Sequence, residues 1–161
     1  MEPIRTAVVT VSDRVWQGQY ADRSGPRIRE LLDARYVVVA AEVVPDERDR
    51  IEATLRRLSD ELAVELILTT GGTGPALRDV TPEATLRVCD RLLPGVAEWM
   101  RAESLRYTRL AVFSRAVAGI RNRTVIVNLP GNPKAISELL PGLRELLPHA
   151  VGLLRGGKHE L

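Results

Sequence analysis

Short runs of apolar, largely β-branched residues recur along the chain, and most are followed by a polar loop. These runs predict strands at residues 6–11, 36–44, 64–69, 110–113, 116–120 and 124–129. Apolar runs of this length without polar alternation are typical of strands buried on both faces of a sheet. The last two strands flank Arg121-Asn122-Arg123, which predicts a β-hairpin.

Apolar residues spaced by three or four predict helices in the intervals between most of the strands. The expected helices span 26–34, 47–62, 82–92, a segment from Pro94-Gly95 to about 107, and a last segment from Pro133 to about 147. Strands that alternate with helices predict a three-layer α/β/α sandwich with a mainly parallel sheet and one small hairpin. We expect one domain over residues 1–161.

Ligands of such sheets bind in the crevice beyond the carboxyl ends of the strands, so the loops at these ends are the candidate site. Four loops are of interest, at residues 12–13, 45–47, 71–81 and 130–133. The third begins with Gly71-Gly72-Thr73-Gly74. A tight turn explains a single glycine, but three within four residues after a buried strand favour backbone N–H groups that hold phosphate.

Two helix starts add to this pattern. Thr81-Pro82-Glu83 and Asn132-Pro133 each place a capping residue before a proline. The free N–H groups and positive dipole of a helix start favour phosphate, although each start taken alone favours plain capping. The segment 152–158 matches G-x-x-x-x-G-K, but His159 stands where Ser or Thr is required and we interpret it as a tail.

The aspartates Asp13, Asp46 and Asp79 lie in three of these regions. Capping of the helix that begins at Glu47 is an alternative explanation for Asp46. A carboxylate beside a phosphate-binding loop repels its ligand unless a cation stands between them. If the loops bind phosphate, the aspartates therefore imply Mg²⁺.

Composition further limits the class of protein to which the chain can belong. A net charge of +2 gives no argument for nucleic acid. Cys89 is the only cysteine, so the chain forms no internal disulfide or cysteine metal cluster. No signal-peptide run or apolar stretch of about 20 residues is present, so we expect a cytoplasmic protein without a membrane span. His149 and His159 are expected at the surface rather than in catalysis. Trp16, Trp99 and Phe113 are candidates for the core or for an interface, and we expect the core.

Several of these motifs together resemble one family. TTGGTGPALRDVTPEA at 69–84 closely resembles the signature of the MogA-type molybdopterin adenylyltransferases. TVSD at 10–13, VPDE at 44–47, SR at 114–115 and NLPGNPK at 128–134 resemble the same family in the same order. The related insertase domain and a competence-type family differ in the glycine loop, and MoaB-type paralogues usually differ in the stretch after it.

The resemblance implies an enzyme that transfers AMP from Mg-ATP to the terminal phosphate of molybdopterin and releases pyrophosphate, in molybdenum-cofactor biosynthesis. It implies that Asp46 and Asp79 are catalytic and hold Mg²⁺. The substrate-binding residues that it implies are Thr10, Ser12, Asp13, Gly71, Gly72, Thr73, Gly74, Thr81, Glu83, Ser114, Arg115, Pro130, Gly131 and Asn132. Which loop serves which substrate stays open, and Arg115 is a candidate phosphate fork.

The resemblance also implies a homotrimer and contact with the molybdenum insertase that acts next in the pathway. The alternative is a non-catalytic, MoaB-like carrier that binds molybdopterin without transferring AMP.

Overall fold

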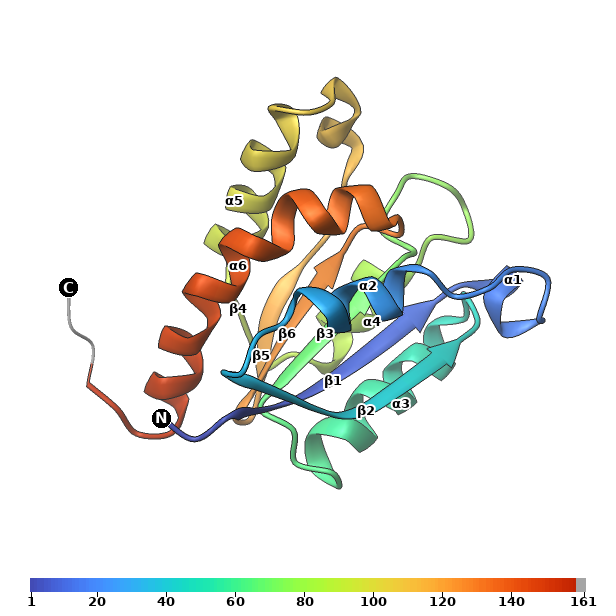
Figure 1. Ribbon diagram of the computed structural model, residues 1–161. Coiled ribbons are helices and arrows are strands. Elements are labelled where there is room, and N and C mark those ends of the chain that lie inside the picture. Colours follow the sequence, from blue (N-terminus) through green and yellow to red (C-terminus); the bar gives the residue numbers. More distant parts are fainter. Residues whose placement is uncertain (159–161) are drawn as a thin grey trace.

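A computed structural model describes residues 1–158 of the chain. Within them, helices pack on both faces of one six-stranded sheet (Figure 1). The strands are β1 (Ile4–Val11), β2 (Tyr36–Val44), β3 (Leu66–Thr70), β4 (Arg91–Leu92), β5 (Ala118–Arg121) and β6 (Thr124–Leu129), and their order in the sheet is β2-β1-β3-β6-β5-β4. The pairs β1–β2, β1–β3 and β3–β6 are parallel, whereas β5 is antiparallel to both β6 and β4.

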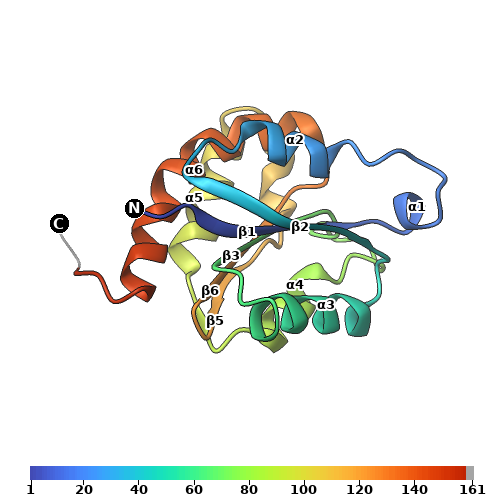
Figure 2. The ribbon, with the colours of Figure 1, turned by 60° about the horizontal axis from the view of Figure 1, so that its bottom comes forward.

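The helices form the two outer layers (Figure 2). One layer contains α2 (Ser24–Leu31), α5 (Pro94–Leu105) and α6 (Pro133–Leu154), and the other contains α3 (Arg48–Asp60) and α4 (Thr81–Val88). The short helix α1 (Asp13–Trp16) follows β1, and the 3₁₀ helix η1 (Arg109–Phe113) follows α5. The predicted three-layer α/β/α architecture with a mainly parallel sheet is confirmed.

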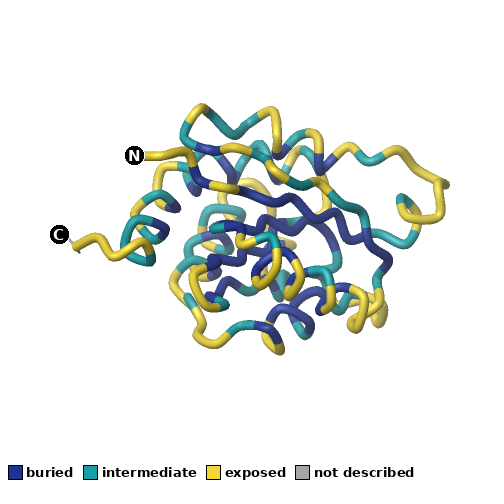
Figure 3. Tube along the Cα trace, turned by 90° about the horizontal axis from the view of Figure 1, so that it is seen from below, coloured by how far each residue is buried: buried dark blue, intermediate teal, exposed yellow. Residues whose placement is uncertain are grey.

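Each face of the sheet has its own apolar core, because alternate side chains of a strand point to opposite faces. Leu66 and Leu68 of β3 pack in the core beneath α6, whereas Ile67 between them packs in the core beneath α3. All residues of β3 are buried, and Figure 3 shows the central strands as the buried layer of the molecule. Burial of each leucine or isoleucine side chain in this strand stabilises the fold by about 1.5–3 kcal/mol.

The hairpin prediction is confirmed. β5 and β6 pair from Arg121 and Thr124 onward, and Asn122 in the turn adopts a left-handed φ of 53°. Such a positive φ is what a tight two-residue hairpin turn requires.

The strand predicted at 110–113 is wrong. These residues lie in η1, where the Thr108 hydroxyl accepts from the Leu110 N–H at 3.2 Å and so starts a helical turn. Val112 and Phe113 are 61% and 57% exposed, and only Ala111 of the run is buried, so most of the run lies outside the core. Trp16 is also exposed rather than in the core, whereas Trp99 packs against the core.

The helix ends that differ most from the prediction are those of α4 and α6. α4 ends at Val88, and Arg91–Leu92, expected in that helix, form β4 at the sheet edge. α6 continues through Pro148 to Leu154, because Leu147 and Val151 on the same face remain buried in the core. Among the described residues, no helix is both long and apolar enough to cross a bilayer.

Candidate active site

The four predicted loops meet at the carboxyl edge of the parallel strands. In the sheet, β1 lies between β2 and β3. The connection from β1 to β2 passes through α2 on one face, and the connection from β2 to β3 passes through α3 on the other face. This reversal between β1 and β3 is where open α/β sheets bind their ligands. The Thr70 hydroxyl donates to the Pro130 carbonyl at 2.7 Å, and Gly71 N–H donates to the Leu129 carbonyl at 3.2 Å.

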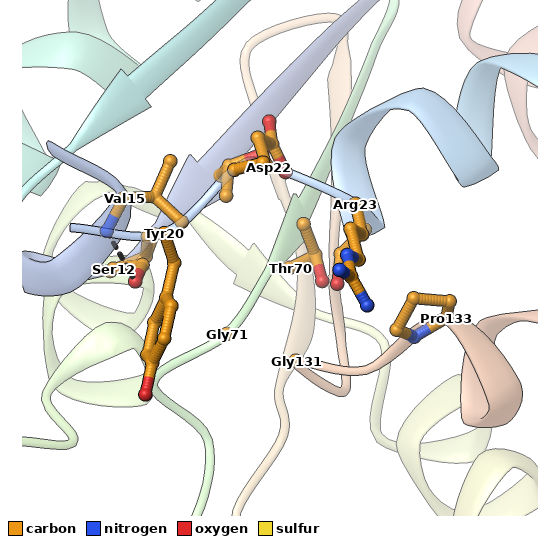
Figure 4. Close-up of a pocket in the computed structure, with 13 residues that line it drawn as sticks. Ser12, Val15, Tyr20, Asp22, Arg23, Thr70, Gly71, Gly131 and Pro133 are labelled. Atoms are coloured by element: carbon orange, nitrogen blue, oxygen red, sulfur yellow. Dashed lines mark hydrogen bonds between the residues drawn. The ribbon is translucent and has the colours of Figure 1, made fainter. Parts of the chain in front are cut away.

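A crevice of about 360 Å³ opens at this reversal (Figure 4). We call it the β1 crevice; it is lined by Thr10, Val11, Ser12, Val15, Tyr20, Ala21, Asp22, Arg23, Ser24, Thr70, Gly71, Gly131 and Pro133. Part of its wall is main chain, because Gly71 has a φ of 99° and a Cβ there would overlap the Val11 carbonyl oxygen. A Cβ on Gly131 would lie 3.0 Å from the Gly71 Cα, so two glycine backbones pack directly together.

A second cavity of about 470 Å³ lies near the same loops, between α5, η1 and α6. We call it the α5 cavity; it is lined by Thr73, Gly74, Pro75, Met100, Arg101, Ser104, Thr108, Leu110, Ala111, Phe113, Ser114, Ala116, Asn128, Pro130, Asn132, Ala135 and Leu139. The loops 71–74 and 130–132 contribute residues to both cavities. These two loops therefore form a ridge with space for a ligand on either side.

The predicted site residues divide between the two spaces. Thr10, Ser12, Gly71 and Gly131 line the β1 crevice. Thr73, Gly74, Ser114, Pro130 and Asn132 line the α5 cavity. Gly72 lies within the ridge itself. The remaining predicted residues support the ridge through the contacts described below: Asp13, Asp46, Asp79, Thr81, Glu83 and Arg115. Asp46 and Glu83 also line a separate, more open pocket.

Asp13 and Asp46 bind each other's backbone. Asp13 N–H donates to Asp46 Oδ2 at 2.9 Å, and Asp46 N–H donates to Asp13 Oδ1 at 2.9 Å. Arg78 then covers Asp13 with a bidentate ion pair, from Nε to Oδ2 at 2.8 Å and from Nη2 to Oδ1 at 2.9 Å. Hydrogen bonding from Arg78 lowers the pKa of the Asp13 carboxyl below its ordinary value of 3.8. Asp13 is therefore an ionised, charge-compensated support.

Asp46 has the opposite electrostatic environment. Burial raises the pKa of its carboxyl above 3.8, and the nearby charges of Asp13 and Asp79 raise it further. Its Oδ1 faces Gly72, where a Cβ would lie 3.2 Å from that oxygen, and Asp79 Oδ2 faces Gly74, where a Cβ would lie 2.9 Å away. The two carboxylates thus flank successive glycines of the same loop.

This arrangement fits a Mg²⁺ ion that shares its ligands with a substrate. Within residues 1–158 no group of three or more His, Cys, Asp and Glu side chains converges as a complete metal site. Mg²⁺ usually binds proteins through one or two carboxylates and takes its other ligands from phosphates and water. A cation would also relieve the repulsion that raises the pKa of Asp46.

Capping roles differ from the prediction at two of the three candidate positions. Asp46 does not cap α3, whose N-cap is Glu47 without a side-chain cap bond. Thr81 is not an N-cap either, because α4 begins at Thr81 itself and the Thr81 hydroxyl donates to the Gly71 carbonyl at 2.9 Å. It thereby holds the glycine loop. Asn132 does cap α6, and its side chain accepts from Ala135 N–H at 2.8 Å.

The Arg115 guanidinium is already engaged, which differs from the expected phosphate fork. It forms a bidentate pair with Glu83, and the shorter of the two contacts is 2.6 Å. It also donates to the carbonyls of Gly74 at 2.9 Å and Asp79 at 2.7 Å. Hydrogen bonding from Arg115 lowers the pKa of the Glu83 carboxyl. Arg115 thus clamps the loop that carries Asp79.

A buried polar cluster behind the ridge was missed by the sequence analysis. Asn128 is fully buried in β6, and its amide donates to the hydroxyls of Thr69 and Thr85 at 3.0 Å each. Its side-chain oxygen accepts from Val117 N–H at 3.1 Å. An amide inside an otherwise apolar strand was the available signal, since a buried polar group requires partners.

The crevice residues Tyr20, Asp22 and Arg23 were also missed. Asp22 Oδ2 accepts from the Thr10 hydroxyl at 2.8 Å, and Asp22 Oδ1 accepts from Gly25 N–H at 3.0 Å. These residues lie in an irregular segment between α1 and α2. No motif spacing or hydrophobic periodicity marks them as binding residues in the sequence. Their position in the crevice follows only from the fold of this loop.

Comparison with known proteins shows the family of the chain. Residues 7–149 match the family described as a probable molybdopterin binding domain. A molybdopterin adenylyltransferase of Helicobacter pylori (strain J99) is 48% identical over 160 residues, which cover 97% of this chain and 90% of that protein. The molybdopterin adenylyltransferase of Escherichia coli (strain K12) is 42% identical over 171 residues, with 97% and 88% covered.

Solved structures show the same fold. The molybdopterin biosynthesis enzyme MoaB of Thermus thermophilus superposes with a TM-score of 0.90 at 46% identity, covering 98% of this chain and 99% of that chain. The Mog protein of Mycobacterium ulcerans gives a TM-score of 0.87 at 33% identity, covering 97% and 99%. The fold defines an α/β protein whose candidate ligand site lies at a topological switch point. The chain belongs to the molybdopterin-binding family of molybdenum-cofactor biosynthesis proteins.

Proposed function

We propose that this protein is a molybdopterin adenylyltransferase, which transfers AMP from Mg-ATP to the terminal phosphate of molybdopterin and releases pyrophosphate. The observation that carries the proposal is the ridge of loops 71–74 and 130–132, which contributes residues to both the β1 crevice and the α5 cavity. Asp46 and Asp79 flank the glycine part of this ridge. The relatives named molybdopterin adenylyltransferase at 42–48% identity support the same reaction.

The chemistry requires positioning more than proton transfer. A terminal phosphate oxygen of molybdopterin forms a bond to the α-phosphorus of ATP, the bond from that phosphorus to the bridging oxygen breaks, and pyrophosphate leaves with the electron pair. The nucleophile is already anionic, so the reaction needs no general base. The described histidine, His149, lies on α6 away from the residues that line the two cavities, and His159 lies outside the described residues.

The chain supplies orientation and charge stabilisation, which account for most of the catalysis in phosphoryl-group reactions. We place one substrate in each cavity, so that the two reacting phosphates meet over Gly71–Gly74. Asp46 and Asp79 would hold Mg²⁺, and a bound Mg²⁺ supplies neutralisation of phosphate charge and activation of the pyrophosphate leaving group. Thr81 and Arg115 hold the glycine loop in place from below.

The decisive experiment measures pyrophosphate release by the purified protein with Mg-ATP, in the presence and absence of molybdopterin. Release that requires both molybdopterin and Mg²⁺ supports adenylyl transfer. Binding of molybdopterin without any release would support the MoaB-like carrier and overturn the proposal.

A matched pair of aspartate variants sharpens the test. Asp79→Asn preserves the shape of the side chain but removes its charge, and we expect at least a hundredfold loss of turnover in a folded protein. Asp49→Asn, in the first turn of α3, is the control and should retain activity. Near-normal turnover of folded Asp79→Asn would remove Asp79 from the mechanism.

We also propose the finer properties that the resemblance implies: a homotrimer, a cytoplasmic location and contact with the molybdenum insertase. Light scattering on the purified protein tests the trimer, since a mass near three times 17.8 kDa is expected. Co-purification with the insertase tests the contact.

A further inference from the structure

An aromatic ring overhangs the β1 crevice. Tyr20 lines the crevice and remains 59% exposed (Figure 4). Arg14 stacks over this ring, with its guanidinium carbon 5.3 Å from the ring centroid, and the Arg14 carbonyl accepts from Gln19 N–H at 2.8 Å. The ring is therefore held in place before any ligand arrives, which reduces the entropy lost on binding.

A cation faces the same crevice. Arg23 lines it, and Figure 4 shows its guanidinium between Thr70 and Pro133. In the described part of the chain the Arg23 side chain makes no ion pair and donates no hydrogen bond, unlike Arg78 and Arg115. The carboxylate next to it, Asp22, is already occupied by Thr10 and Gly25. Arg23 is thus a cation available to an incoming anion.

We infer that Tyr20 and Arg23 together bind one substrate in the β1 crevice, where Tyr20 stacks on its fused nitrogen heteroaromatic ring and Arg23 pairs with its phosphate. A tyrosine face suits such rings, and a guanidinium suits phosphate oxygens. Adenine nucleotides and molybdopterin share this chemistry. The inference rests on the proposed function only for the identity of these two ligands.

The test distinguishes the contribution of the Tyr20 ring to binding from that of the Arg23 pair with phosphate. It also distinguishes binding of AMP from binding of molybdopterin. Equilibrium binding of AMP and of molybdopterin is measured separately for the wild type, Tyr20→Ala, Tyr20→Phe, Arg23→Ala and Arg23→Lys. We expect Tyr20→Ala and Arg23→Ala each to weaken binding of the same single ligand by about tenfold. Tyr20→Phe should bind as the wild type does, because it keeps the ring, and Arg23→Lys should recover part of the loss.

Turnover gives a second readout. In Tyr20→Ala and Arg23→Ala, KM for that ligand should rise about tenfold, while kcat stays within about twofold. The controls are Tyr107→Ala, at a tyrosine 54% exposed beyond α5, and Arg29→Ala, on the exposed side of α2. Neither residue lines the β1 crevice, and both control proteins should bind like the wild type.

The outcomes are distinct. A selective effect on AMP places the nucleotide in the β1 crevice, and a selective effect on molybdopterin places the pterin there. Unchanged binding of both ligands in Tyr20→Ala and Arg23→Ala overturns the inference. So does equal weakening of both ligands accompanied by a lower Tm. If the wild type releases no pyrophosphate but shows the selective binding effect, the proposed function fails and this inference stands.

Discussion

Asp13 and Asp46 are bound to each other through reciprocal hydrogen bonds, in which each backbone N–H donates to the other residue's carboxylate at 2.9 Å. The pair joins the loops after β1 and β2. It fixes Asp46 Oδ2 and leaves Asp46 Oδ1 facing the glycine loop. Asp13 therefore affects the site by positioning Asp46, and Arg78 affects it by positioning Asp13.

The first prediction concerns Arg78 as a positioning residue. Arg78→Ala removes the bidentate pair with Asp13 and should lower kcat about tenfold, a loss of the size that misplacement of reacting groups produces. The Arg78 side chain is 62% exposed, so Tm should change little. Arg106→Ala breaks a comparably exposed pair with Glu103 and should leave both quantities unchanged. A large fall in Tm with normal kcat would show a structural role instead.

The second prediction separates the effect of Asp46 on turnover from its effect on the stability of the protein. Its carboxyl has a raised pKa in the folded protein, so ionisation costs more there than in the unfolded chain, whose pKa is near 3.8. This cost is absent below pH 3.8, grows as the pH rises through the folded pKa, and is fully present at neutral pH. Asp46→Asn should therefore keep or raise Tm at pH 7 while turnover falls at least a hundredfold. Loss of folding in this variant would contradict the electrostatic account.

The third prediction concerns the pH dependence of activity. If ionised Asp46 is required, the acidic limb of the kcat/KM profile for Mg-ATP, which reports the free enzyme, should lie at a higher pH than an ordinary aspartate would give. Mg²⁺ favours the ionised form and should move the carboxyl titration of Asp46, followed by NMR without substrates, to lower pH. A titration that Mg²⁺ does not move would exclude Asp46 as a ligand. The NMR readout does not depend on turnover.

The fourth prediction concerns the Arg115 clamp. Arg115→Ala removes donors from the carbonyls of Gly74 and Asp79 and breaks the pair with Glu83. We expect a loss of about 1–2 kcal/mol in the free energy of unfolding, because solvent partly replaces these bonds. Turnover should fall as well, since the loop carrying Asp79 loosens. Urea unfolding and steady-state kinetics of Arg115→Ala and Arg115→Lys measure both, and an unchanged kcat in a destabilised protein would limit Arg115 to folding.

Much of the site's location could be predicted from the sequence, because apolar runs marked the strands and parallel strands end at one edge. The polar residues after β1, β2, β3 and β6 therefore had to converge. The role of Arg115 could not be predicted in this way. Its acidic partner, Glu83, is 32 positions away, and local sequence gives no sign of which carboxylate an arginine will meet. The same limit applies to Arg78 and Asp13, which are 65 positions apart.

Local patterns also failed where tertiary context decided the outcome. The run 110–113 has the composition of a strand but lies outside the sheet, so the Thr108 cap determines its helical turn. Tyr20 and Arg23 lie in an irregular segment with no period to interpret. Only the fold, which places this segment beside the ends of β1 and β3, brings both side chains to the crevice.

The close packing of Gly71 on Gly131 and on the Val11 carbonyl has a consequence for how this binding site can diversify. A surface made of main chain offers no side chain to exchange, and any substituent larger than hydrogen would push the loops apart. Point mutation can therefore destroy this part of the site but can hardly retune it. New ligand preferences would have to arise in the segments that overhang it, which can vary without disturbing the sheet beneath.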